Sequence, residues 1–206
     1  MSTKLKIAAA VAAAVLLSAC SSPKHEPMPL VKFTPSMEVT EVWSKGLSSA
    51  EGFLVPAVYD DMVFAAGGKT LTRLNARTGE TEWSVSFNSP ITGGVGSDGY
   101  VTAVGLWDGN LEVVDAEGKV SWEKKLTTEL ASPPVVSHGL VTARTMDTRV
   151  SAFEASSGEL QWTYQRSQPA LTVRLPTRML AHDNFLLVGQ PNGHIVILDI
   201  ASGKPM

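Results

Sequence analysis

The strongest constraint on the fold is a tryptophan that returns about every 40 residues. Trp43, Trp83, Trp122 and Trp162 are separated by 40, 39 and 40 residues. Self-similarity at a period of 20–50 residues is typical of propellers, solenoids and other repeat architectures. Glycines recur at similar intervals of 39, 40 and 45 residues, and the first three of them stand four residues before a tryptophan: Gly79, Gly118, Gly158 and Gly203. We therefore expect similar units of about 40 residues.

Each period is predicted to contain four short strands. The second period provides the example, with strands expected over Ile91–Val95, Tyr100–Val104, Leu111–Asp115 and Ser121–Lys125. These runs are rich in β-branched residues and are separated by turn dipeptides such as Asp98-Gly99. Four antiparallel strands per unit is the arrangement of a β-propeller blade. The sequence predicts an all-β chain in which residues 37–206 form three full blades and part of a fourth.

The repeated glycine and tryptophan receive structural roles. The glycine precedes the outermost strand of its blade, at a turn where a positive φ is convenient. Trp83, Trp122 and Trp162 are expected to pack between adjacent blades. A β-sandwich with turns every 8–12 residues is the alternative fold, but it does not explain the spacing of the tryptophans.

The N-terminus is predicted to be a targeting segment. Two lysines precede an 11-residue apolar run, Ile7–Leu17. Such a run is too short for a membrane span, which needs about 20 residues, but it suits a secretory signal. The single cysteine, Cys20, follows the sequence Leu-Ser-Ala as in a bacterial lipobox. We predict a signal peptide over 1–19, lipidation of Cys20 and a flexible tether over 20–36. The alternative is an ordinary signal peptide with an unmodified cysteine.

Composition and motifs argue against a catalytic, metal or nucleotide site. A net charge of −3 argues against a chain that coats nucleic acid, and one cysteine excludes an internal disulfide framework or a cysteine-based metal site. The G-x-G-x-x-G match at Gly94–Gly99 precedes an expected strand, whereas a dinucleotide site needs a helix. The four histidines lack metal-site spacing. We predict no catalytic residue, no metal and no cofactor.

The segments LNARTGETEW, VDAEGKVSW and FEASSGELQW resemble the repeat of quinoprotein-like (PQQ-type) propellers. With the lipobox, the chain is similar to the propeller lipoproteins of the outer-membrane β-barrel assembly (BAM) machinery, most closely over Ser132–Met206. The resemblance implies an eight-bladed ring of which this chain is an N-terminal portion, about half. We expect an incomplete ring. The strand around Trp43, which in the family belongs to the final blade, is expected to be detached, disordered or paired non-natively.

The resemblance also implies a function. It predicts a non-catalytic scaffold, lipid-anchored at the periplasmic face of the outer membrane, that binds BamA and other BAM subunits and assists unfolded outer-membrane proteins. The interval from Gly158 to Gly203 is 45 residues, and the excess falls after Tyr164. In the family the matching loop contacts BamA, so the resemblance assigns this contact to Leu171, Val173 and Arg174. The alternative is that Leu171 and Val173 simply begin a strand.

Two other functions remain open from the sequence. One is a generic periplasmic propeller that binds a ligand such as a sugar or a peptide. The other is a fragment of a quinoprotein dehydrogenase. Enzymes of that family stack a vicinal cysteine pair on the quinone, whereas this chain has one cysteine, which the lipobox already uses.

Overall fold

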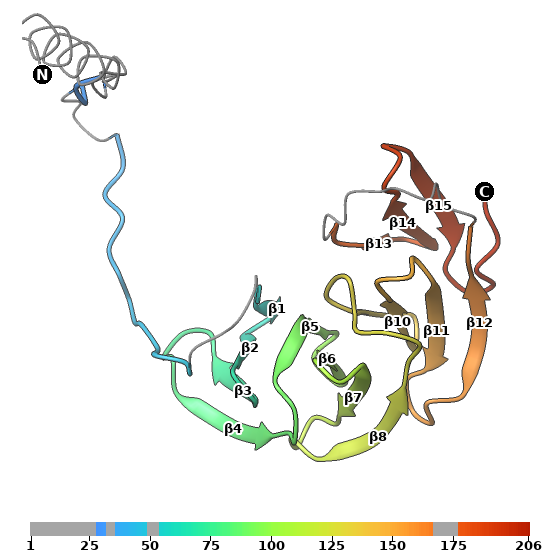
Figure 1. Cartoon of the computed structure of the whole chain (residues 1–206). Coiled ribbons are helices and arrows are strands. Elements are labelled where there is room, and N and C mark those ends of the chain that lie inside the picture. Colours follow the sequence, from blue (N-terminus) through green and yellow to red (C-terminus); the bar gives the residue numbers. More distant parts are fainter. Residues whose placement is uncertain (1–27, 32–35, 49–53, 167–176) are drawn as a thin grey trace, which may run out of the picture. The chain divides into compact units, whose positions relative to one another are not determined.

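A computed structural model of the chain describes residues 28–31, 36–48, 54–166 and 177–206 (Figure 1). The chain divides into two units, Met1–Thr40 and Glu41–Met206. In the first unit, the described residues form neither helix nor strand. Cys20 and the expected signal peptide lie outside the described residues. Within the ranges given, no helix is long and apolar enough to cross a membrane.

The second unit contains four antiparallel sheets whose strands follow chain order. The first blade comprises β1 (Ala57–Tyr59), β2 (Met62–Gly67), β3 (Thr70–Asn75) and β4 (Thr81–Ser86). The second blade comprises β5 (Ile91–Ser97), β6 (Thr102–Leu106), β7 (Asn110–Val114) and β8 (Val120–Lys125). The third blade comprises β9 (Val135–Ser137), β10 (Leu140–Arg144), β11 (Val150–Glu154) and β12 (Leu160–Tyr164). The fourth has three strands, β13 (Leu180–His182), β14 (Phe185–Gly189) and β15 (Ile195–Asp199), with an isolated bridge between Leu198 and Pro205.

The strands predicted for the second period are therefore confirmed, with shifts of one or two residues at their ends. One such shift occurs at β6, which begins at Thr102 and not at Tyr100. Its cause is the preceding turn, where the Asp98 carboxylate accepts hydrogen bonds from the backbone N–H groups of Tyr100 and Val101, at 3.1 and 2.8 Å. An aspartate that bonds the backbone in this way extends the turn and delays the strand.

Apolar side chains fill each boundary between consecutive blades. Phe64 and Leu71 of the first blade pack with Val95 of the second. Further clusters join the second blade to the third and the third to the fourth. Each blade thus buries a face against its neighbour, as in a propeller, and the four blades form an incomplete β-propeller. Figure 1 shows the four sheets in chain order.

The repeated glycine and tryptophan make the same contact, here called the Trp–Gly contact, at each boundary. All four repeat glycines have positive φ, between 68° and 82°. A Cβ added to Gly118 would lie 2.7 Å from Trp83, and one on Gly158 would lie 2.7 Å from Trp122. Gly203 approaches Trp162 in the same way. Only glycine allows both the backbone angle and the approach of the indole ring.

A hydrogen bond completes each Trp–Gly contact. The indole N–H of each tryptophan donates to a backbone carbonyl just before the next glycine turn. The donor and acceptor pairs are Trp83 with Ala116 at 2.9 Å, Trp122 with Ala155 at 2.8 Å, and Trp162 with Ile200 at 3.0 Å. A buried indole N–H needs such a partner, and the bond fixes the rotation of one blade against the next.

The expectation that the strand around Trp43 is detached was wrong for the tryptophan itself, although residues 41–48 form no strand. Its indole N–H donates to the carbonyl of Ala76 at 2.9 Å, and a Cβ on Gly79 would lie 2.6 Å from its ring. Trp43 therefore makes the same Trp–Gly contact with the first blade that Trp83 makes with the second. The Gly79 turn presents a complete binding surface for the indole, which is why Trp43 is not detached.

Candidate partner-binding surface

The residues predicted to contact BamA lie in the connection between β12 and β13. Leu171, Val173 and Arg174 fall within residues 167–176, outside the described residues, so their role stays a prediction. The structure describes both flanks of this segment. Arg166, after the end of β12, and Thr177, before β13, are exposed.

A buried arginine holds the second flank. Arg144 ends β10 and is only 3% exposed. Its Nη1 donates to the hydroxyl of Thr177 at 2.6 Å, and that hydroxyl lies 3.4 Å from the carbonyl of Gly189, to which it donates. Burial lowers the pKa of Arg144. Removing a guanidinium from water is costly, and the hydrogen bond to Thr177 offsets part of that cost at the point where the chain enters the fourth blade.

Arg144 departs from the repeat. It pairs with Val150, whereas the corresponding pairs are Ala66 with Leu71 in the first blade and Gly105 with Leu111 in the second. Two blades thus have a small residue where the third has an arginine, and the arginine occurs at the boundary that carries the longer connection. Sequence reasoning missed Arg144, because an alignment of the blades on their tryptophans places Thr145 opposite Ala66 and Gly105, and only the strand register brings Arg144 to this position.

A carboxyl pair lies on the second blade. Glu112 of β7 is 7% exposed and stands opposite Glu123 of β8. The corresponding pairs in the first and third blades are hydroxyls, Thr72 with Ser84 at 3.0 Å and Ser151 with Thr163 at 3.2 Å. Burial raises the pKa of Glu112 to about 6, with smaller contributions from the charges of Glu123 and Asp108. The pair destabilises the blade when both groups are ionised.

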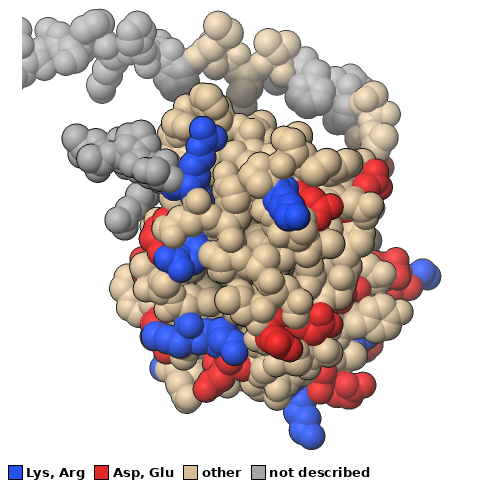
Figure 2. Space-filling model, turned by 90° about the vertical axis from the view of Figure 1, so that its right-hand side faces the viewer, with Lys and Arg blue, Asp and Glu red and all other residues tan. Residues whose placement is uncertain are grey.

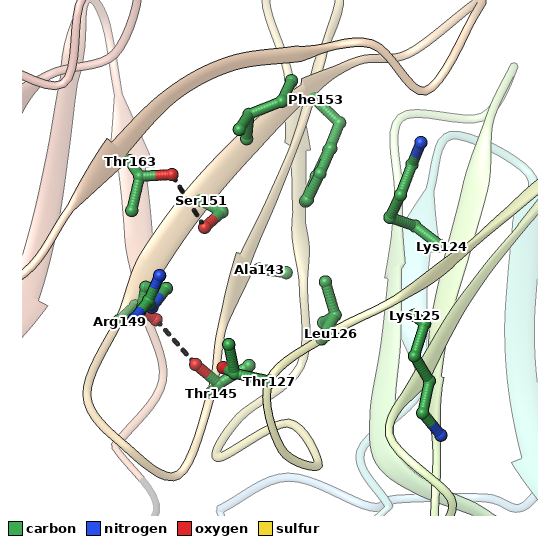
Figure 3. Close-up of a pocket in the computed structure, with 11 residues that line it drawn as sticks. Lys124, Lys125, Leu126, Thr127, Ala143, Thr145, Arg149, Ser151, Phe153 and Thr163 are labelled. Carbon is green, nitrogen blue, oxygen red and sulfur yellow. Dashed lines mark hydrogen bonds between the residues drawn. The ribbon is translucent and has the colours of Figure 1, made fainter.

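A groove of about 240 Å³ lies between the second and third blades (Figure 3). Lys124 and Lys125 approach it from β8, and Phe153 contributes an apolar wall. The Ser151 hydroxyl pairs with Thr163 and not with a base. No carboxylate or histidine lines the groove.

The other motifs have structural explanations. Gly94 and Gly96 lie within β5, and a Cβ on either would approach Pro133 or Pro134 of the next blade. The G-x-G-x-x-G match therefore serves blade packing. His138, His182 and His194 are exposed. In the part of the chain that the structure describes, no cluster of three or more His, Cys, Asp or Glu side chains could hold a metal ion. On the face in Figure 2, acidic and basic side chains are interspersed.

Comparisons with known proteins agree on one family. A family model described as outer membrane protein assembly factor BamB matches residues 39–90 and 67–206. The chain is 36% identical over 203 residues to the outer membrane protein assembly factor BamB of Burkholderia pseudomallei, covering 96% of the chain and 53% of the relative. It is 32% identical to that of Bordetella pertussis, covering 91% and 50%. The chain thus spans about half the length of these curated relatives.

Solved structures show the same fold. The crystal structure of BamB from Moraxella catarrhalis is similar with a TM-score of 0.66 and 28% identity, over 74% of this chain and 47% of that one. A quinohemoprotein alcohol dehydrogenase from Comamonas testosteroni is similar with a TM-score of 0.56 and 20% identity, over 78% and 34%. At this identity the second likeness shows the propeller fold alone.

Proposed function

Because the chain belongs to the family of the outer membrane protein assembly factor BamB, we propose that it is a non-catalytic scaffold of the outer-membrane protein assembly machinery. The observation that carries this proposal is the family match, which extends through all four blades, from residue 39 to residue 206. In this function the chain binds BamA and other BAM subunits and assists the folding and insertion of β-barrel proteins.

The proposed location is the periplasmic face of the outer membrane. The thiol of Cys20 is lipidated after removal of residues 1–19, and residues 20–36 tether the propeller. Several acyl chains give firm anchoring because each buried CH₂ contributes about 0.8 kcal/mol. The position of the single cysteine directly after the apolar run supports this part of the proposal.

The proposed contact with BamA is made by Leu171, Val173 and Arg174. Two features of the chain support it. The connection that carries these residues is the longest interval between repeat glycines, and extra residues in repeat proteins often form binding loops. Its second flank is fixed by the hydrogen bond from Arg144 to Thr177, and rigid flanks reduce the entropy cost of binding.

The proposal is tested by the affinity of the chain for the purified periplasmic domains of BamA. Arg174→Glu places an anion where a cation is proposed to contact the partner, and we expect at least tenfold weaker binding if the contact is desolvated. Lys119→Glu is the matched control, because Lys119 is exposed in the turn before β8, far along the chain from residues 167–176. Equal affinities of Arg174→Glu, Lys119→Glu and the unaltered chain would contradict the assignment of this connection.

A further inference from the structure

Trp107 is the tryptophan that does not belong to the 40-residue period. It stands in the turn between β6 and β7 and is 66% exposed. The four periodic tryptophans each donate a hydrogen bond to a backbone carbonyl and are at least partly buried. Trp107 therefore does not hold blades together, and its exposed indole calls for another explanation.

The turn that carries Trp107 is firmly held. The backbone N–H of Trp107 donates to the carbonyl of Pro90 at 2.8 Å, and that of Gly109 donates to Leu106 at 2.9 Å. The N–H of Leu126 donates to the carbonyl of Gly109 at 3.0 Å. A large aromatic side chain on a fixed backbone offers contact area at a low entropy cost, and tryptophan is enriched among interface hot spots.

Hydrogen bonds connect this turn to the flank of the β12–β13 connection. Leu126, bonded to the Trp107 turn, begins the segment that leads to the third blade. In that segment Glu129 accepts a hydrogen bond from the N–H of Met146, in the β10–β11 turn, at 3.0 Å. Arg144, at the start of the same turn, donates to Thr177. These turns and segments form one continuous edge across the second, third and fourth blades, here called the turn rim.

The exit of β12 lies on the turn rim as well. Tyr164, its last residue, pairs with Val150, which in turn pairs with Arg144. Both described flanks of residues 167–176 are therefore on the rim that carries Trp107. Tyr100 marks the opposite rim, because it lies in the β5–β6 turn at the other end of β6.

We propose that Trp107 is a second anchor of the BamA-binding surface, inserted into an apolar pocket on a folded periplasmic domain of BamA. This inference rests on the function proposed above. A stable interface buries about 800 Å² and about 20–30 residues on each side, which three residues of one connection cannot supply. A partner that contacts the connection therefore contacts further residues as well, and Trp107 is the exposed tryptophan among the described residues of the turn rim.

The test compares two exposed aromatic residues on opposite rims. Trp107→Ala in the full chain is expected to weaken binding to the periplasmic domains of BamA at least tenfold, and Trp107→Phe to weaken it less. Tyr100→Ala is the matched control, since Tyr100 is 73% exposed on the other rim, and its affinity is expected to change less than twofold. Melting temperatures of all variants should stay near that of the unaltered chain, because neither ring is part of a blade boundary.

Three outcomes would overturn the inference, and they are distinguishable. If the unaltered chain binds BamA and Arg174→Glu weakens binding, an unchanged affinity of Trp107→Ala refutes the second anchor alone. Equal losses in Trp107→Ala and Tyr100→Ala refute the role of the turn rim. An unaltered chain that does not bind the BamA domains refutes the proposed function, and with it this inference.

Discussion

The Trp–Gly contact predicts that a single methyl group at Gly118 will loosen two blades. Gly118 has a φ of +82°, and a Cβ there would lie 2.7 Å from the ring of Trp83. Gly139 has a similar φ of +71° but nothing within 4 Å of an added Cβ. The pair Gly118→Ala and Gly139→Ala therefore separates the backbone cost from the cost of displacing the indole ring.

The expected loss of unfolding free energy is the sum of the backbone cost and the cost of displacing the indole ring. A non-glycine residue at positive φ costs about 1–2 kcal/mol, and this is the whole expected effect of Gly139→Ala. Overpacking adds about 1–3 kcal/mol, and loss of the 2.9 Å bond from Trp83 to Ala116 contributes about 1 kcal/mol of that range. Gly118→Ala should therefore be about 2 kcal/mol more destabilising than Gly139→Ala. For a chain of this size that is a difference of about 4–8 °C in melting temperature.

Thermal unfolding followed by circular dichroism measures this difference. A Trp83→Ala background supplies the second test, because the added methyl group then meets no ring. In that background, the cost of Gly118→Ala should fall to that of Gly139→Ala, as expected for two residues in direct contact. Equal melting temperatures of Gly118→Ala and Gly139→Ala in the otherwise unaltered chain would refute the structural role of the Trp–Gly contact.

Three further predictions concern buried charge and lipidation. The pKa of Glu112 is raised to about 6, so its folded state favours the proton, and stability should fall as pH rises from about 4.5 through 6, by about 2 kcal/mol. Glu112→Gln should therefore raise the melting temperature at pH 7.5 and change it little at pH 4.5, while exposed Glu117→Gln should have little effect at either pH; equal gains for Glu112→Gln at both pH values would contradict this. Arg144→Met, which keeps volume and removes a buried charge, should leave stability unchanged or raise it, whereas Arg144→Ala should lower it through the cavity; a large loss in Arg144→Met, measured by denaturant unfolding, would show that the bond to Thr177 stabilises the boundary. Cys20→Ser should leave the mature protein soluble in the periplasm, and mass spectrometry of a membrane-bound form with an unmodified Cys20 would contradict lipidation.

Much of the fold could be predicted because the repeat presents the same evidence several times. A tryptophan four residues after a glycine, three times over, identifies the outermost strand and its turn, and Trp83, Trp122 and Trp162 all occupy the expected boundaries. The expectation that Trp43 is detached was wrong because it considered only the blade to which the strand around Trp43 belongs in the family. The turn on its other side, at Gly79, supplies the contact.

The features specific to one blade were not predictable in the same way. Glu112 and Glu123 stand opposite each other where the first and third blades have hydroxyl pairs. All three blades share the nearby register shift, so the repeat predicts the pairing but not the burial of a carboxyl pair in one blade. Arg144 at the end of a strand suggests a solvated cation, and its burial follows from the chain that enters the fourth blade at Thr177. Such contacts join segments that are distant in the sequence, so the pattern of residues within one strand or turn does not predict them.

The central claim is that this chain is a scaffold held to BamA. Its most direct test is the recovery of BamA with the tagged full chain from detergent-solubilised outer membranes. We predict that BamA co-purifies in a fixed ratio to the chain, and that Arg174→Glu lowers this ratio at equal membrane levels of the chain while Lys119→Glu does not. Recovery of the unaltered chain from the outer membrane without BamA would contradict the scaffold account.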